Sequence, residues 1–165
     1  MYHSSLKEFI SWIATHGIKA YSPETVARDL NISLDASCHS AHSAISTLLC
    51  EAFTTAQLTT EIDSPTSADD FFEVMLTFLE NLSDYKTDLE TIFNRDSLSF
   101  KNFSLAPTLN KLTQTLFESK IETFLDNLTY NIIICSIFYE WLQDSTPDLS
   151  HSATKINHAS QNIFS

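Results

Sequence analysis

The stretch HGIKAYSPETVARDLNIS, residues 16–33, decides the fold expected for this chain. Gly17 is a typical helix stop, and the residues before it show the apolar spacing of an amphipathic helix over 4–16. Ser22 is a good N-cap, and Pro23 favours the first helical position, so a second helix begins there. The chain therefore opens with two short helices joined by a tight turn.

Composition excludes several classes of protein. The 165 residues include one glycine and four prolines, while 43% are hydrophobic. Phosphate-binding loops, dinucleotide fingerprints and nucleophile elbows need glycine where the backbone turns sharply or approaches a ligand. Tight β-hairpins favour it as well. We therefore expect an all-α fold of about eight or nine helices without strands.

Apolar residues recur at helical spacing along the rest of the chain. Further helices are expected over residues 34–41, 44–62, 71–82 and 150–164, and Leu89, Ile92 and Phe93 extend or follow the helix over 71–82. Apolar residues also recur at helical spacing over 105–128 and lead into the apolar run 132–142. The polar segment DSPTSADD, residues 63–70, carries turn and helix-start residues and no apolar run. It is the expected hinge between a head, residues 1–62, and a helical body, residues 66–165.

The net charge of the chain argues against some partners, and its cysteine usage indicates a reducing environment. The net charge of −12 opposes binding to nucleic acid or anionic membranes unless a local basic patch overrides it. Three cysteines without disulfide or C-x-x-C spacing predict reduced thiols in a cytoplasmic protein. The N-terminus lacks the pattern of a signal peptide. The longest apolar run, residues 132–142, is too short to span a bilayer, so no integral membrane association is expected.

Two segments carry a resemblance to a known family. A glycine after the first helix, followed by SPETVARDLNIS, resembles the helix-turn-helix head of TetR/AcrR-type transcriptional regulators. The segment FYEWLQDSTPDLSHSATKINHASQNI, residues 138–163, is similar to the end of these proteins, where a Trp-Leu-x-Asp helix finish precedes a last helix. The resemblance implies a homodimer formed by the last two helices and a body that binds a small apolar ligand.

The departures from the family lie in the part that would contact DNA. Positions that usually hold Tyr, Phe and Lys are occupied here by Cys38, by Ala41 or His42, and by Ala44. Residues 1–55 contain three basic and five acidic side chains, whereas specific DNA binding needs several contacts to phosphates. We therefore expect a degenerate head whose DNA binding is weak or lost. The remaining candidates for DNA contact are Lys19, Arg28, Ser33 and Ser37.

The resemblance also implies two sets of residues in the body. Aromatic side chains that could line an apolar pocket are Phe72, Phe78, Phe93, Phe117, Phe124, Tyr130 and Phe138, with Tyr130 or Asn131 as a polar anchor. The residues expected at the dimer interface are Ile137, Trp141, Ile156 and Ile163. The pocket has an alternative interpretation, because aromatic stripes at helical spacing also form plain core.

No pattern predicts catalysis, a metal or a cofactor. Cys38 and His42 are spaced i, i+4, which supplies two metal ligands, but the sequence marks no third ligand. The acidic residues Asp69, Asp70 and Glu73 fall at a helix start, where the helix dipole favours them. No nucleophile–base–acid spacing stands out. We expect that the chain is not an enzyme.

Three functional hypotheses follow. The first is a TetR-like regulator that binds a small apolar ligand or a protein partner, with DNA binding weak or lost. The second is a lipid or isoprenoid carrier similar to the TetR-like accessory proteins of ubiquinone biosynthesis, although the last helix has few large apolar residues for a membrane. The third is a pure protein-interaction module. A cavity or an exposed apolar patch would distinguish them.

Overall fold

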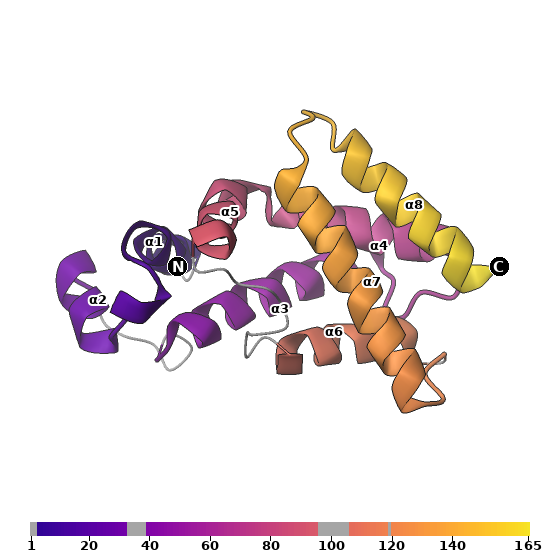
Figure 1. Ribbon diagram of the computed structural model, residues 1–165, viewed down its shortest axis with the longest axis horizontal. Coiled ribbons are helices and arrows are strands. Elements are labelled where there is room, and N and C mark those ends of the chain that lie inside the picture. The colour runs from indigo at the N-terminus through magenta and orange to yellow at the C-terminus, as the bar shows by residue number, and fades with distance from the viewer. Residues whose placement is uncertain (1–2, 33–38, 96–105, 119) are drawn as a thin grey trace. The chain divides into compact units, whose positions relative to one another are not determined.

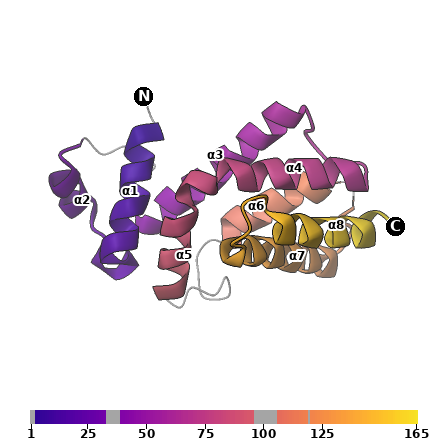
Figure 2. The same ribbon diagram turned by 90° about the horizontal axis from the view of Figure 1, so that it is seen from above.

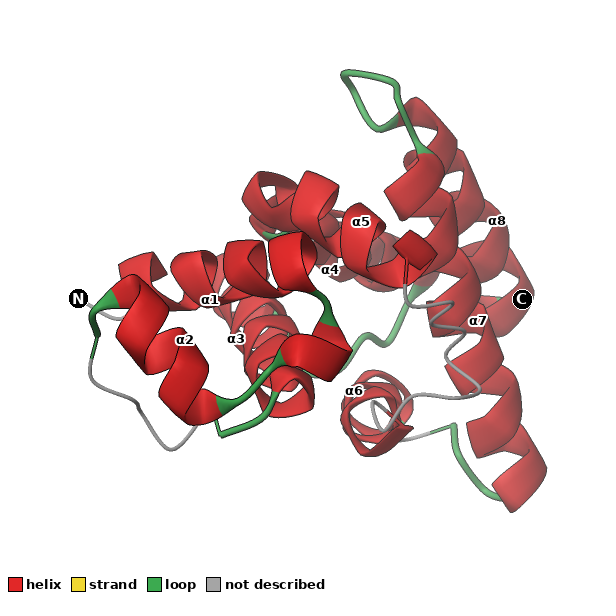
Figure 3. Cartoon of the chain, turned by 60° about the vertical axis from the view of Figure 1, so that its left-hand side comes forward, coloured by secondary structure: helices red, strands yellow, loops and turns green. Residues whose placement is uncertain are grey.

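The protein is helical throughout its described part. The computed structural model describes residues 3–32, 39–95, 106–118 and 120–165. Within these residues it holds eight α-helices, two short 3-10 helices and no strand, which confirms the expected all-α fold (Figures 1 and 3). No helix among the described residues combines the length and apolar character needed to cross a membrane.

The helices follow the expected order closely. The α-helices are α1 (His3–His16), α2 (Pro23–Leu30), α3 (Ala41–Thr60), α4 (Ala68–Asn81), α5 (Lys86–Arg95), α6 (Ala106–Phe117), α7 (Phe124–Gln143) and α8 (Ser150–Phe164). The 3-10 helices are η1 (Ile18–Ala20) and η3 (Ser83–Tyr85). The helix expected over 34–41 falls mostly outside the described residues.

The chain divides into two compact units. The head unit comprises residues 1–49 and 84–105, and the body unit comprises residues 50–83 and 106–165. The division runs through α3 and assigns α5 to the head unit. The units are groups of residues in contact and are not shown to fold independently. The domains 1–62 and 66–165 therefore stay a prediction.

In the head unit, α1 packs against both α2 and α5 (Figure 3). Its buried face includes Phe9, Ile10 and Ile13. Side chains of α5 add polar links to α1. Asp88 accepts a hydrogen bond from Ser11 at 2.5 Å, and the Arg95 guanidinium donates to the carbonyl oxygens of Ile13 and Thr15 at 3.2 and 2.9 Å. Because the last carbonyls of a helix lack partners within the helix, Arg95 stabilises the end of α1.

Gly17 makes the turn after α1 possible. Its backbone has φ +93° and ψ 156°, a combination that is essentially restricted to glycine. A Cβ atom there would also lie 2.6 Å from Nη2 of Arg95. Because Nη2 is the far end of a long, flexible side chain, the backbone conformation is the stronger requirement for glycine.

In the body unit, α8 packs against α4 and α7, and α6 packs against α7 (Figures 1 and 2). The buried face of α7 consists of Ile134, Ile137, Phe138, Trp141 and Leu142. The other helices contribute side chains of the same kind, among them Phe71, Met75, Leu116, Phe117 and Ile156. The body unit therefore has its own hydrophobic core.

The helical spacing expected over residues 105–128 is divided between two helices, and the second continues through the apolar run 132–142. The structure ends α6 at Phe117 and begins α7 at Phe124. Thr123 is the cause of the new start, because its hydroxyl accepts a hydrogen bond from the amide of Asp126, whose carboxylate accepts one from the Thr123 amide. This capping box satisfies two amides that a helix start leaves without partners. The apolar spacing alone did not show the interruption.

A buried carboxylate joins α7 to α8. Asp144 accepts hydrogen bonds from the amide and hydroxyl of Ser152 at 2.8 and 2.7 Å, and from the amide and hydroxyl of Thr146 at 3.0 and 2.5 Å. Burial acts to raise the pKa of Asp144, but these hydrogen bonds outweigh burial and hold the pKa well below its ordinary value. Asp144 is the last residue of the Trp-Leu-x-Asp finish, which therefore has a structural role here.

Replacing the only glycine is expected to destabilise the protein. Gly17→Ala forces a residue with a Cβ atom into the left-handed region, at a cost of about 1–3 kcal/mol in the free energy of unfolding. Urea unfolding followed by circular dichroism measures this loss in the free energy of unfolding. The double variant Gly17→Ala with Arg95→Ala is the control, and it should show no recovery. Full recovery would mean that the contact with Arg95, and not the backbone conformation, requires the glycine.

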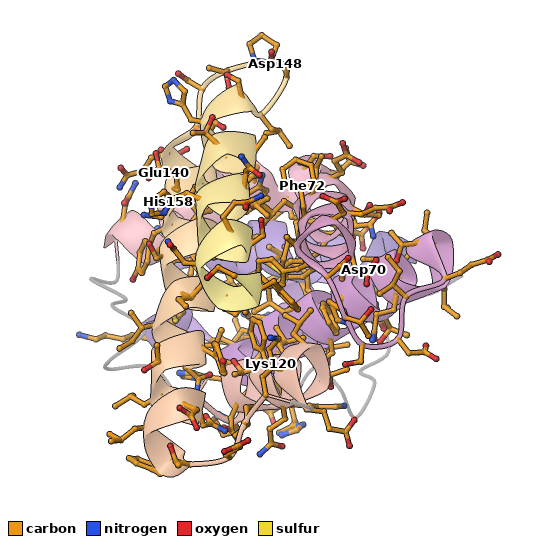
Figure 4. The ribbon with its side chains drawn as sticks, turned by 90° about the vertical axis from the view of Figure 1, so that its right-hand side faces the viewer. Asp70, Phe72, Lys120, Glu140, Asp148 and His158 are labelled. Carbon is orange, nitrogen blue, oxygen red and sulfur yellow. The ribbon has the colours of Figure 1, made fainter. Side chains whose placement is uncertain are left out.

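Asp144→Asn is expected to lower the free energy of unfolding at pH 7 by about 1–3 kcal/mol, because four hydrogen bonds lose their charged acceptor. A lowered pKa in the folded state means that the ionised carboxylate stabilises the fold above its ordinary pKa of 3.8. The difference between wild type and variant should therefore shrink as the pH falls below about 3.8. Asp148→Asn, at the exposed tip of the same connection (Figure 4), is the matched control. A variant as stable as wild type at pH 7 would contradict the assignment.

Candidate interaction surface

The described head residues offer little basic surface. Lys19 is exposed on η1. Arg28 is exposed on α2, but its guanidinium lies 3.1 Å from the carboxylate of Asp29, which also accepts a hydrogen bond from the Trp12 indole at 3.2 Å. The bonds from Arg28 and Trp12 lower the pKa of Asp29, so its negative charge persists beside Arg28. Ser33 and Ser37 lie outside the described residues.

The polar clusters considered for metal binding or catalysis have structural roles or incomplete geometry. Cys38 lies outside the described residues, and the described ones contain no group of three His, Cys, Asp or Glu side chains able to hold a metal ion. Asp70 forms a capping box with Ser67 at the start of α4. Hydrogen bonds from Thr66, with a further contribution from Ser67, lower the pKa of Asp70. These contacts fit a helix cap.

The structure gives the predicted pocket aromatics different surroundings. In the body core, Phe117 stacks on Tyr130 with ring centres 4.2 Å apart, and Phe78 and Phe138 are buried. Phe93 belongs to the head unit, Phe72 is half-buried on α4 (Figure 4), and Phe124 is 80% exposed. Asn131, one of the two suggested polar anchors, accepts a hydrogen bond from Thr113 at 2.7 Å and donates one to Asn127 at 2.6 Å. These contacts link α6 to α7.

The residues expected at the dimer interface lie mostly inside one chain. Ile137, Trp141 and Ile156 are fully buried in the body core, and Ile163 is half-buried. In this arrangement a partner reaches none of the first three. The expectation of a dimer therefore has to be reconsidered with the residues that α7 exposes.

The exposed side of α7 carries an apolar stripe, defined as Leu125, Leu128, Ile132, Cys135 and Tyr139. The first three are 69%, 46% and 61% exposed, and the last two are half-buried. Their spacing alternates between three and four residues, which is the spacing of a seam between paired helices. No Asp, Glu, Lys or Arg occurs from residue 127 to 139. Burial raises the pKa of the Cys135 thiol to about 11, so Cys135 is present in the stripe as a neutral thiol.

The geometry of the body unit explains why the stripe is uncovered. Helix α7 has 20 residues, whereas α8 has 15. The two meet near the connection at residues 144–149, and the N-terminal turns of α7 continue beyond the end of α8 (Figures 1 and 4). Helix α6 contacts α7 on the side of Asn131. The stripe lies on the side that these neighbours leave open.

Sequence reasoning treated the apolar residues of α7 as core and missed this stripe. The signal that separates them is their position around the helix. The buried Ile134, Ile137 and Trp141 recur at spacings of three and four, and the stripe recurs in the same way on the other side. Both series were present in the sequence, but only the packing of α6 and α8 decides which of them is covered.

Comparisons of the chain with protein-family models, with curated proteins and with solved structures find no match. The resemblance to the TetR/AcrR family therefore rests on the residues quoted for it.

Proposed function

We propose that this chain is a TetR-like regulatory protein of the cytoplasm that works as a homodimer and acts on a protein partner, with direct DNA binding weak or lost. The observation that carries the proposal is the apolar stripe of α7. Monomers seldom keep a contiguous exposed apolar stripe on a regular helix unless another molecule covers it. The cytoplasmic location rests on the predicted reduced cysteines.

A second copy of the chain is a suitable occupant of the stripe. Dimers with a two-fold axis bring the same surface of both chains together, so the surface must complement itself. A stripe without charged residues complements itself even in a chain of net charge −12, because no like charges meet along it. Burying a Leu or Ile side chain contributes about 1.5–3 kcal/mol, so a few such residues from each chain support association.

The charges of the head support loss of DNA binding. Neutralising a phosphate needs a basic side chain, and the described residues from α1 to α3 provide only Lys7, Lys19 and Arg28, one of which is paired with an acid. A protein partner is favoured over a small apolar ligand for a separate reason. Phe71, Phe117 and Tyr130 contact one another in the body core, whereas the uncovered apolar side chains lie at the surface of the body.

Ile132→Glu is expected to give a monomer. The change places a charge in the middle of the stripe, and two copies would bring these charges together across a two-fold axis. The fold should persist, because Ile132 is largely exposed. Size-exclusion chromatography with light scattering measures the mass. Leu58→Glu, at a leucine of α3 that is 75% exposed, is the matched control and should leave the mass unchanged. Equal masses for wild type and Ile132→Glu would contradict the dimer seam.

A salt titration of DNA binding tests whether the head contacts phosphates. Fluorescence anisotropy with mixed-sequence duplex DNA should show no binding that depends on salt, since each phosphate contact would add about 0.9 to the slope of log K against log salt. The variant Asp29→Asn, which removes the acid beside Arg28, should change this little, because one released arginine supplies at most one contact. Tight wild-type binding with a steep slope would refute the loss of DNA binding.

A further inference from the structure

The spacing of the apolar stripe limits the ways in which two copies of α7 can meet. Leu125, Leu128, Ile132, Cys135 and Tyr139 follow one another at intervals of three, four, three and four residues, so they alternate between the a and d positions of a heptad. Two copies related by a two-fold axis present this same face to each other. The two helices then run either parallel or antiparallel, and the charges and exposures along the stripe distinguish these arrangements.

The charges at the two ends of the stripe favour the antiparallel direction. Asp126 directly follows the first residue of the stripe, and Glu140 directly follows the last (Figure 4). A parallel pair sets each of these acids level with its own copy, so that like charges meet at both ends. It also brings together the two helix N-termini, which carry partial positive charge. An antiparallel pair sets the two helix dipoles in opposite directions and separates these N-termini.

The exposures along the stripe favour one antiparallel register. Reversing one helix reverses the order of the intervals of three and four residues, so the two stripes match at every residue only where an a residue faces a d residue. The most exposed residues of the stripe are Leu125, Leu128 and Ile132, in its N-terminal half. A two-fold axis between Leu128 and Ile132 sets these two residues against each other across the chains, and it sets Leu125 against Cys135. This register covers all three exposed side chains of each copy.

The next register along the stripe, with the axis between Ile132 and Cys135, is less favourable for two reasons. It sets Leu125 level with Leu142 of the second copy, which is buried in its own core, so the 69% exposed Leu125 stays without an apolar partner. It also sets Asp126 of one copy nearly level with Glu140 of the other. With the axis between Leu128 and Ile132, these two acids are about 9 Å apart along the helices, which weakens their repulsion.

We propose that the stripes of two copies pair antiparallel, with the two-fold axis between Leu128 and Ile132. Leu128 of each copy packs against Ile132 of the other, and Leu125 of each copy packs against Cys135 of the other. This arrangement rests on the proposed function, because it specifies the direction and the register of the dimer seam. It also gives Cys135 a place inside the seam, where a small, neutral thiol packs beside a leucine.

Disulfide formation with the native Cys135 tests this arrangement in the full chain. The parent for the test carries Cys38→Ser and Cys50→Ser, so that Cys135 is its only cysteine. Adding Leu125→Cys, at an exposed position, should convert most of the chain to a covalent dimer on oxidation with copper phenanthroline in air. Non-reducing electrophoresis measures the yield, and mass spectrometry of tryptic peptides should show the bond between position 125 of one chain and Cys135 of the other. Within one chain these positions are about 15 Å apart along α7, which is too far for a disulfide.

Matched controls separate the alternatives. The parent should stay without a disulfide, because its two Cys135 residues are about 15 Å apart along the seam, whereas a parallel pair would join them. Ile132→Cys in the same parent tests the next register, and a bond from position 132 to Cys135 of the other chain would overturn the proposal. Light scattering of the reduced proteins separates the two claims. A dimeric mass without the bond from position 125 to Cys135 would overturn the arrangement alone, and a monomeric mass would overturn the dimer seam as well.

Discussion

The packing of α7 is the constraint on which the rest of the account depends. This helix is apolar on nearly all sides, and a single chain covers only part of it. Helices α6 and α8 pack against α7, whose Ile134, Ile137 and Trp141 are buried, while Leu125, Leu128 and Ile132 are exposed to water. A helix of this kind needs neighbours around most of its circumference. A second α7 is the neighbour that we propose for this exposed side.

Polar side chains join the ends of helices in a chain that has one glycine. Asp144 joins α7 to α8 by accepting four hydrogen bonds, and Arg95 joins α5 to the end of α1. Both act on backbone groups that helix ends leave without partners. Capping boxes at Ser67 and Thr123 begin two further helices in the same way. Helix ends defined by side chains allow short connections without the flexible turns that glycine usually provides.

The sequence predicted the helical class well because apolar spacing and scarcity of glycine act locally. It placed Ser22, Pro23 and the last helix correctly for the same reason. It did not predict which side of α7 is exposed. Leu128 and Ile137 are both apolar residues at helical spacing, and only the packing of the folded chain leaves the first exposed and the second buried. The break before Thr123 was missed because the apolar spacing continues through it. Phe124 was expected in a pocket, but it is the first residue of α7 and is 80% exposed.

The mass of the wild-type chain in solution tests the central claim most directly. Sedimentation equilibrium over a wide range of protein concentration gives that mass without assumptions about shape. The account predicts a species of twice the 18.6 kDa chain that dissociates only on dilution. A mass of 18.6 kDa at every concentration would contradict it, because the stripe of α7 would then remain exposed in the free protein.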